Sequence, residues 1–197
     1  MAKELFVVGN KVDIPDSSRI SKHDFADNIV FVGKMDYEPN IVAVTFFVTE
    51  VFCKLKEKWN ALNFIIVGVN PTKEIYNLTR IDGVQVTGFV KDVEPYYQKA
   101  TIVVAPMLTG AGIQNKIIQA MAYSCCVVTT PVGADGLVIN NDEIAIYEDA
   151  EEMIIGIDGL LNNRCRRVRM GKLARDYIFD YLSENKIESD FWAFIGK

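Results

Sequence analysis

The sequence contains few residues suited to metal binding or nucleophilic catalysis. Its 197 residues include one histidine and four cysteines. Cys125 and Cys126 are adjacent, and none of the cysteines has the spacing of a metal-ligand motif. This composition argues against a zinc site or a Ser-His-Asp triad carried by this chain alone. We therefore expect no metal cofactor, and free thiols are typical of a reducing compartment.

Long apolar runs and an excess of basic residues are also missing. No run approaches the roughly 20 apolar residues that span a bilayer, and residues 1–10 do not form a secretion signal. We therefore expect a cytoplasmic protein. The formal net charge of −5 argues against nucleic acid as the main partner. The basic stretch RCRRVR, residues 164–169, lies in a predicted helix, which favours a solvated face over a contact with an anionic surface.

Short runs rich in valine and isoleucine alternate with longer helical patterns along the chain. Half of the residues are hydrophobic and 24% are charged, as in ordinary globular proteins. Mostly continuous apolar runs are typical of strands covered on both faces of a parallel sheet. The sequence therefore predicts an α/β fold, a doubly wound, Rossmann-like parallel sheet. The predicted strands are residues 4–9, 28–33, 63–68, 83–88, 101–106, 126–131 and 143–148.

The clearest helical patterns follow three of these strands. One begins near Pro39, and another is AGIQNKIIQAMAYS, residues 111–124. A third begins at Asp149, which forms a capping-box pattern with Glu152. Only helical patterns follow, up to residue 197.

Small or stiff residues end most of the predicted strands, where parallel sheets place their ligand sites. A turn would explain any one of these residues equally well. As a set along one edge, they favour a ligand site. They are Gly33, Gly68, Gly88, Pro106 and Pro131.

Lys116 lies in the first turn of a predicted helix, behind Gly110 and Gly112. The unpaired amides and the dipole of a helix start attract anions, so a lysine there is unfavourable unless an anion is bound. A phosphate or diphosphate would use the loop amides and the ammonium group together. The alternative is a solvated lysine. Lys34, directly after another strand, stands on the same edge, and an exposed loop lysine is its alternative.

The order of the segments NIVFVGKMDYEPNI, FIIVG, VQVTGFVKDVEPYYQKATIVVAPM and GAGIQNKIIQAMAYSCCVVTTPVGADGL resembles the C-terminal half of GT-B fold glycosyltransferases of family 4 (group 1). The resemblance covers roughly residues 5–195 and is most specific over residues 88–137. It implies a retaining transferase whose C-terminal half binds a nucleotide diphosphate sugar. It implies that the loop at residues 110–113 and the next helix meet the diphosphate and sugar, Lys34 lies near the phosphates, and the Phe89–Val90 backbone lies by the base. The donor-binding residues so predicted are Gly33, Lys34, Phe89, Val90, Gly110, Ala111, Gly112, Ile113, Asn115, Lys116 and Gln119, and no catalytic residue is assigned.

The sequence departs from the family pattern in this region. Ala111 and Gln119 stand where the family usually has two glutamates eight positions apart. A second basic residue of the family falls near Pro39 or Asn40 and is missing. These changes indicate a divergent branch in which Asn115 and Lys116 share the work.

The resemblance also implies a second domain. We expect residues 1–22 to be a linker with a leading strand, residues 23–182 to be the donor-binding domain, and residues 183–197 to be a helix that crosses back to an absent N-terminal domain. That domain would bind a sugar or lipid-linked acceptor, and the full-length protein would associate peripherally with a membrane. Two alternatives remain: a degenerate non-catalytic module that binds nucleotide or a partner, and half of a GT-B sugar-nucleotide epimerase.

Overall fold

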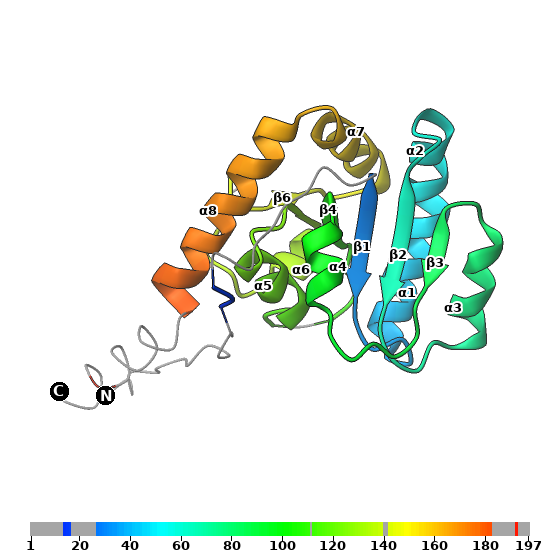
Figure 1. The fold of residues 1–197 in the computed structure, drawn as a ribbon, viewed down its shortest axis with the longest axis horizontal. Coiled ribbons are helices and arrows are strands. Elements are labelled where there is room, and N and C mark those ends of the chain that lie inside the picture. Colours follow the sequence, from blue (N-terminus) through cyan, green and yellow to red (C-terminus); the bar gives the residue numbers. More distant parts are fainter. Residues whose placement is uncertain (1–13, 17–26, 111, 140–141, 183–191, 193–197) are drawn as a thin grey trace.

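The computed structural model describes residues 14–16, 27–110, 112–139, 142–182 and 192, which include one six-stranded parallel sheet between two layers of helices (Figure 1). The prediction of a doubly wound α/β domain is confirmed. The strand expected at residues 4–9 lies outside the described residues, and the other six are present with shorter bounds. They are β1 (Asn28–Val32), β2 (Asn63–Val67), β3 (Val84–Val86), β4 (Ile102–Ala105), β5 (Val127–Thr129) and β6 (Ala145–Ile146).

The strand order is β3-β2-β1-β4-β5-β6, so the sheet is built outward in both directions from its centre. In β1, Val30 pairs with Ile65 of β2 on one side and with Val103 of β4 on the other. In such a sheet a crevice opens at the carboxyl ends of the two strands where the order reverses. Here those strands are β1 and β4.

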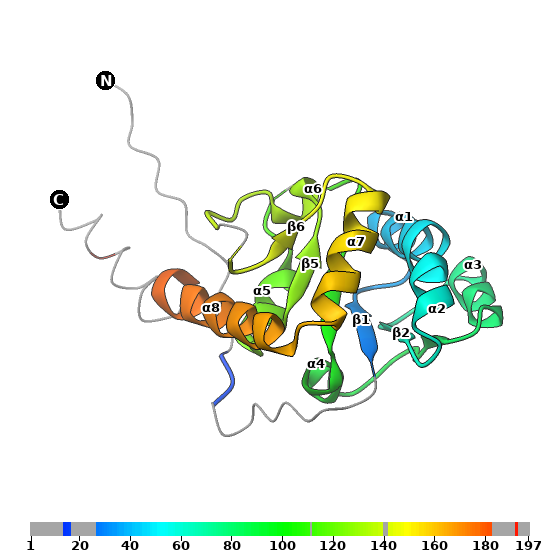
Figure 2. The same cartoon turned by 90° about the horizontal axis from the view of Figure 1, so that it is seen from above.

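Alternate residues of the strands feed two apolar layers. Ile29 and Phe31 pack into one layer and Val30 and Val32 into the other. The first layer contains one continuous helix made of α1 (Glu38–Phe46), the π-helical segment η2 (Phe47–Phe52) and α2 (Cys53–Lys58), together with α7 (Ala150–Leu161). The second contains α4 (Glu94–Lys99), α5 (Asn115–Ala122) and α8 (Arg164–Leu182). Figure 2 shows α7 between α8 and the α1–α2 helix.

The long helices begin much as the sequence pattern predicts. Asp149 accepts a hydrogen bond from the backbone N–H of Glu152 at 2.9 Å, which confirms the predicted cap of α7. The Glu152 carboxylate in turn accepts a hydrogen bond from the backbone N–H of Glu148 at 3.0 Å. In a capping box this carboxylate would accept from the N–H of the cap residue itself, which here is Asp149, one residue later. Three short segments had no clear pattern: α3 (Lys73–Asn77), η3 (Leu78–Arg80) and α6 (Pro131–Ala134).

The basic stretch at residues 164–169 starts α8. Arg164, Arg166 and Arg169 are exposed, as predicted for a solvated face. Arg167 instead donates to the Leu161 carbonyl at 2.8 Å and so joins α8 to the end of α7.

Asp158 on α7 joins this helix to the end of α2. Its carboxylate accepts from Lys58 Nζ at 2.8 Å and from Trp59 Nε1 at 2.9 Å. These two hydrogen bonds, that of Lys58 first, lower the pKa of the Asp158 carboxyl. The contact fixes α7 on the layer that covers β1.

The strand ends at the centre of the sheet approach each other closely at Gly68. This residue has φ +153°, and a Cβ built on it would lie 1.6 Å from the Gly33 carbonyl oxygen. The Gly33 N–H also donates to the Val67 carbonyl at 2.9 Å. Gly68 is therefore required by the approach of two backbone segments, and not by a turn alone.

Candidate functional site

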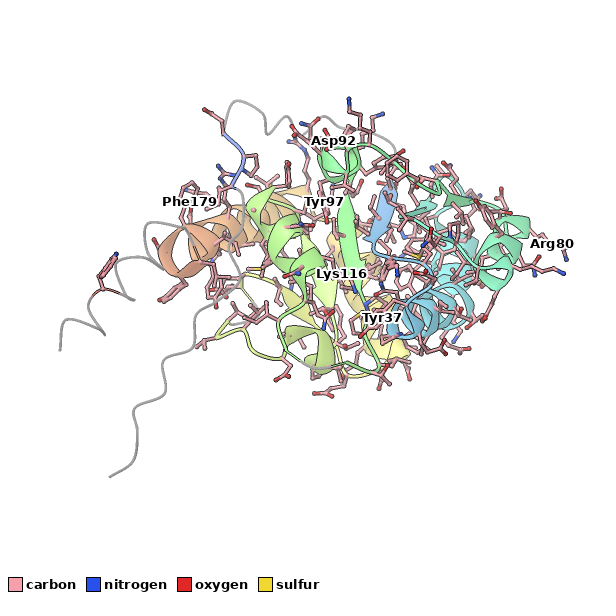
Figure 3. The ribbon with its side chains drawn as sticks, turned by 90° about the horizontal axis from the view of Figure 1, so that it is seen from below. Tyr37, Arg80, Asp92, Tyr97, Lys116 and Phe179 are labelled. Atoms are coloured by element: carbon pink, nitrogen blue, oxygen red, sulfur yellow. The ribbon has the colours of Figure 1, made fainter. Side chains whose placement is uncertain are left out.

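Lys116 is the second residue of α5, and its ammonium lies by the carboxyl ends of β1 and β4. Its Nζ lies 2.6 Å from Asn40 Oδ1, 3.3 Å from Met107 Sδ and 5.1 Å from the centre of the Phe31 ring. These partners come from α1, from the segment after β4 and from β1. Figure 3 looks from below on to the edge where β1 and β2 end and shows Lys116 near the middle, between Tyr97 and Tyr37. We call Lys116, Asn40, Met107 and Phe31 the lysine cluster.

The environment of Lys116 disfavours its positive charge. The side chain is half-buried, and burial lowers its pKa to about 8. Within the part of the chain that the structure describes, no carboxylate lies within ion-pair distance of the Lys116 ammonium. The predicted position in the first turn is confirmed. The side chain is half-buried rather than fully exposed, and its role toward a ligand stays a prediction.

Two helix starts meet at the lysine cluster. Asn40 is the third residue of α1 and Lys116 the second residue of α5, and neither helix has a side chain capping its first turn. The starts of α3, α6 and α7, by contrast, are capped by Thr72, Thr130 and Asp149. Uncapped helix starts carry partial positive charge and bind anions. The half-buried Lys116 ammonium therefore lies where the starts of α1 and α5 already carry partial positive charge.

Asn40 belongs to the candidate site, although the sequence indicated only that a basic residue of the family pattern is missing near this position. Its side chain is 4% exposed, and its Nδ2 donates to the Lys34 carbonyl at 2.9 Å. A Cβ on Gly33 would lie 2.7 Å from the same Nδ2, so the predicted site residue Gly33 makes room for this amide. Local pattern could not reveal it, since asparagine is common at any helix start.

Lys34 reaches the lysine cluster through its backbone alone. Its Nζ pairs with Asp36 at 3.3 Å, and its side chain is 61% exposed. Asp36 also accepts from Asn70 Nδ2 at 3.0 Å, and this hydrogen bond is the first cause of the lowered pKa of Asp36. The role of the Lys34 side chain near a phosphate stays a prediction.

The glycine loop before α5 is held by a carboxylate from another segment. Gly110 and Gly112 have φ values of +133° and +72°, which favour glycine. The Gly112 N–H donates to Asp135 Oδ2 at 3.3 Å, and Gln114 Nε2 donates to the Gly112 carbonyl at 3.2 Å. Asp135, just after α6, was not predicted from the sequence. Its carboxylate occupies an amide that a bound diphosphate would use.

Of the remaining predicted site residues, Ile113, Phe89 and Val90 show no bond to the lysine cluster in the described part of the chain. Ala111 is outside the described residues. Ile113 is half-buried, and its Cγ1 lies 3.0 Å from where a Cβ of Gly136 would be. Phe89, after β3, is 77% exposed, and Val90 beside it is half-buried. Asn115 lies exposed at the start of α5.

Gln119 is exposed one turn beyond Asn115, next to a stacked pair of tyrosines, of which Tyr97 is buried and Tyr123 half-buried. Tyr97 Oη donates to Gln119 Oε1 at 3.5 Å, and the Tyr97 ring stacks on Tyr123 with centroids 5.3 Å apart. The Tyr123 hydroxyl donates to Glu94, which is 7% exposed, at 3.3 Å. Burial, the first cause, raises the pKa of Tyr97, so this residue acts as a neutral donor that orients the Gln119 amide.

The described residues contain neither a candidate metal-binding cluster nor a membrane-spanning helix. No group of three or more His, Cys, Asp or Glu side chains there could hold a metal ion. No helix in the described segments is both long enough and apolar enough to cross a membrane.

A six-stranded parallel sheet between two layers of helices, with its strand order reversing between β1 and β4, defines a Rossmann-like α/β domain. Residues 26–163 match the family model described as "Glycosyl transferases group 1", and the chain belongs to this family. The resemblance found in the sequence is thus confirmed at the level of the family.

A curated relative and several solved structures are similar to this chain. An uncharacterized 44.6 kDa protein in the cps region of Klebsiella pneumoniae is 28% identical over 134 residues, which are 59% of this chain and 34% of that protein. TarM has a TM-score of 0.78 and 21% identity over 100% of this chain and 40% of its own. Anabaena HepE, crystallised with UDP and glucose, has a TM-score of 0.74 and 14% identity over 98% and 56%. The C-terminal domain of a group 1 family protein from Francisella tularensis has a TM-score of 0.65 and 12% identity over 88% and 96%.

These structures share the fold of the chain, which is one Rossmann-like half of a GT-B glycosyltransferase. The chain spans about a third of the curated relative and two fifths of TarM.

Proposed function

We propose that this domain binds the donor, a nucleotide diphosphate sugar, for a glycosyltransferase. The observation that carries the proposal is the half-buried Lys116 ammonium, which has no carboxylate partner among the described residues and lies at the starts of α1 and α5. A diphosphate there would bond to Lys116 and to the amides of the glycine loop. HepE has been crystallised with UDP and glucose and with UDP-glucose, which supports a diphosphate ligand for this fold.

In the proposed reaction, the acceptor hydroxyl oxygen forms a bond to the anomeric carbon of the sugar and gives up its proton to the departing phosphate or to solvent. The bond between that carbon and the β-phosphate oxygen breaks, and the nucleoside diphosphate leaves with added negative charge. Lys116 and the two helix starts would stabilise that charge in a crevice partly screened from water. We propose that no metal is needed for this role, because a cation is already present. Retention of configuration remains a prediction from the family resemblance.

The other groups have proposed places around the diphosphate. Gln119, oriented by Tyr97, would bond to a ribose hydroxyl as a neutral amide. Phe89 and Val90 would lie by the base, and Asn115 would share the phosphate contacts with Lys116. The family match does not favour a degenerate module or an epimerase half.

We further propose that a second domain binds the acceptor, a sugar or lipid-linked sugar, and contributes to a peripheral membrane contact of the full-length protein. The proposed compartment is the cytoplasm, since Cys53, Cys125, Cys126 and Cys165 are all free thiols. Neither nucleic acid nor a membrane span is part of the proposal.

Thermal unfolding of the chain with chelator present tests donor binding. The ligands are UDP, GDP, ADP, CDP and inorganic pyrophosphate. A ligand at 100 times its Kd adds about 2.7 kcal/mol, worth on the order of 5 °C for a domain of this size. We expect such a rise with one nucleotide, its loss in Lys116→Ala, and its survival in Lys73→Ala, which removes an exposed lysine from α3. If millimolar concentrations of all five ligands leave Tm unchanged, donor binding by this domain is wrong.

A further inference from the structure

Asn40 supplies the one oxygen acceptor of the Lys116 ammonium among the described residues, and it is almost fully buried. Its Oδ1 accepts from Lys116 Nζ at 2.6 Å, and its other partner is the backbone of Lys34. A buried amide in an apolar layer costs free energy unless both of its ends are paired. The Asn40 oxygen therefore depends on Lys116 for its donor, and the Lys116 ammonium depends on Asn40 for its oxygen acceptor.

Only one orientation of the Asn40 amide fits its neighbours. The Lys34 carbonyl accepts and cannot donate, so the NH2 group must face it. The Lys116 ammonium donates and cannot accept, so the amide oxygen must face Lys116. The amide thus ties the ammonium to the segment that follows β1, across the crevice from α5.

The contacts leave one ammonium proton of Lys116 for a ligand. An ammonium has three N–H donors. One is directed to Asn40 Oδ1 and one to Met107 Sδ, while the Phe31 ring lies against the charge. We propose that Asn40 is a positioning residue for the donor diphosphate: it holds the Lys116 ammonium at the reversal point of the sheet with its third proton directed at the β-phosphate. This inference rests on the function proposed above.

The charged groups of the surrounding segments do not replace Asn40 in this role. Lys34 and Asp36, after β1, are paired with each other. Glu38 is in the first turn of α1, and Asp135, after α6, accepts from Gly112. Neither carboxylate is within ion-pair distance of Lys116. The protonation of Lys116 therefore depends on its burial, the two helix starts and the Asn40 oxygen.

NMR titration of the ligand-free chain tests the coupling directly. The Lys116 side-chain signal is assigned from its loss in Lys116→Arg, and the Asn40 side-chain amide is followed in the same samples. In the unmodified protein we expect both groups to titrate with one midpoint, near the pKa of about 8 of Lys116. An Asn40 amide that does not respond as Lys116 titrates would overturn the inference without any variant.

Two substitutions should move the Lys116 midpoint in opposite directions. Asn40→Ala removes the acceptor and should lower it by roughly one pH unit, because a hydrogen bond to a charged group is worth about 1.5 kcal/mol or more. Asn40→Asp replaces the amide with a carboxylate and should raise it by at least about one unit. Asn60→Asp, an exposed substitution in the turn before β2 at the opposite edge of the sheet, adds the same charge as a control and should leave the midpoint unchanged. If Asn40 has only a structural role, Tm falls in its variants while the midpoint stays near 8.

Binding of inorganic pyrophosphate at pH 7 separates this inference from the proposed function. We expect Asn40→Asp to bind pyrophosphate at least about tenfold more weakly than the unmodified protein, because its carboxylate pairs with the Lys116 ammonium in place of the ligand. Coupled titration without any pyrophosphate or nucleotide binding would refute the proposed function. Normal pyrophosphate affinity in a folded Asn40→Asp variant would refute the positioning role and leave donor binding intact.

Discussion

The burial of Lys116 predicts how the stability of the domain changes with pH. In the unfolded chain this ammonium has its ordinary pKa of 10.5, and in the folded chain burial lowers the pKa to about 8. Between these values the unfolded state binds more protons, so the free energy of unfolding should rise with pH. Below about pH 8 the cost of the buried charge is present in full, and above about 10.5 it has gone.

The size of this effect follows from the two pKa values. A difference of 10.5 minus about 8 corresponds to about 3 kcal/mol for a group fully removed from water. Because Lys116 remains partly exposed, we expect about half of this, ~1.5 kcal/mol. Other lysines and the tyrosines titrate in the same range, so the effect must be read as a difference between two proteins.

Urea unfolding of the unmodified chain and of Lys116→Met, at pH values from 7 to 10.5, provides that difference. Methionine keeps much of the apolar volume but cannot titrate. We expect the unmodified chain to gain ~1.5 kcal/mol relative to the variant across this range. Parallel curves for the two proteins would mean that Lys116 is not desolvated, and the reasoning on its charge would then be wrong.

Substitutions at four further residues test other parts of the structure. Gly68→Ala should destabilise the fold by more than about 3 kcal/mol in urea unfolding, because its Cβ would overlap a backbone oxygen. Gly159→Ala on α7 should instead stabilise the fold by about 0.5–1 kcal/mol, because a Cβ there meets no atom within 4 Å. Asp158→Ala should cost about 1 kcal/mol at pH 7, and this loss should vanish as the pH falls below the lowered pKa of Asp158, since the unmodified carboxylate then loses its bonds too. Asp135→Asn should strengthen pyrophosphate binding several-fold in calorimetry, because a neutral amide replaces the carboxylate that repels the ligand at the glycine loop. Unchanged or weaker binding would show that this carboxylate does not compete with the anion.

The strands could be predicted because their signal is local. Apolar runs such as NIVFV and IVVA are buried on both sides in the structure, and burial on both faces is what makes such runs continuous. The edge strand β6 keeps two residues of the six predicted at 143–148, since a strand with one neighbour is paired over a shorter length. The short helices α3 and α6 lack the several turns over which a 3.6-residue period can be detected.

The candidate site was predictable in its position but not in its partners. Lys116 could be placed from its glycine loop and helix start, which are adjacent in sequence. Asn40 lies 76 residues away from it, and Asp135 lies 23 residues from Gly112. Contacts between residues so far apart in the sequence leave no local pattern. The family resemblance indicated only that a basic residue is missing near residue 40. The Asn40 side chain comes within hydrogen-bond distance of Lys116 only in the folded chain, in which β1 and β4 are neighbouring strands.

The lysine cluster shows why these departures from ordinary folding preferences occur together. A cation in the first turn of a helix, a lysine half-buried without a carboxylate partner in the described structure, and a buried asparagine are each unfavourable alone. A diphosphate bound between α1 and α5 would make the first two arrangements favourable, because its negative charge would pair with the ammonium and with both helix starts. It would also raise the pKa of Lys116, so donor affinity should fall as the pH rises above about 8. On the proposed function, the ligand-free domain would be the less stable state at neutral pH, and the free energy cost of the buried charge would be recovered when the donor binds.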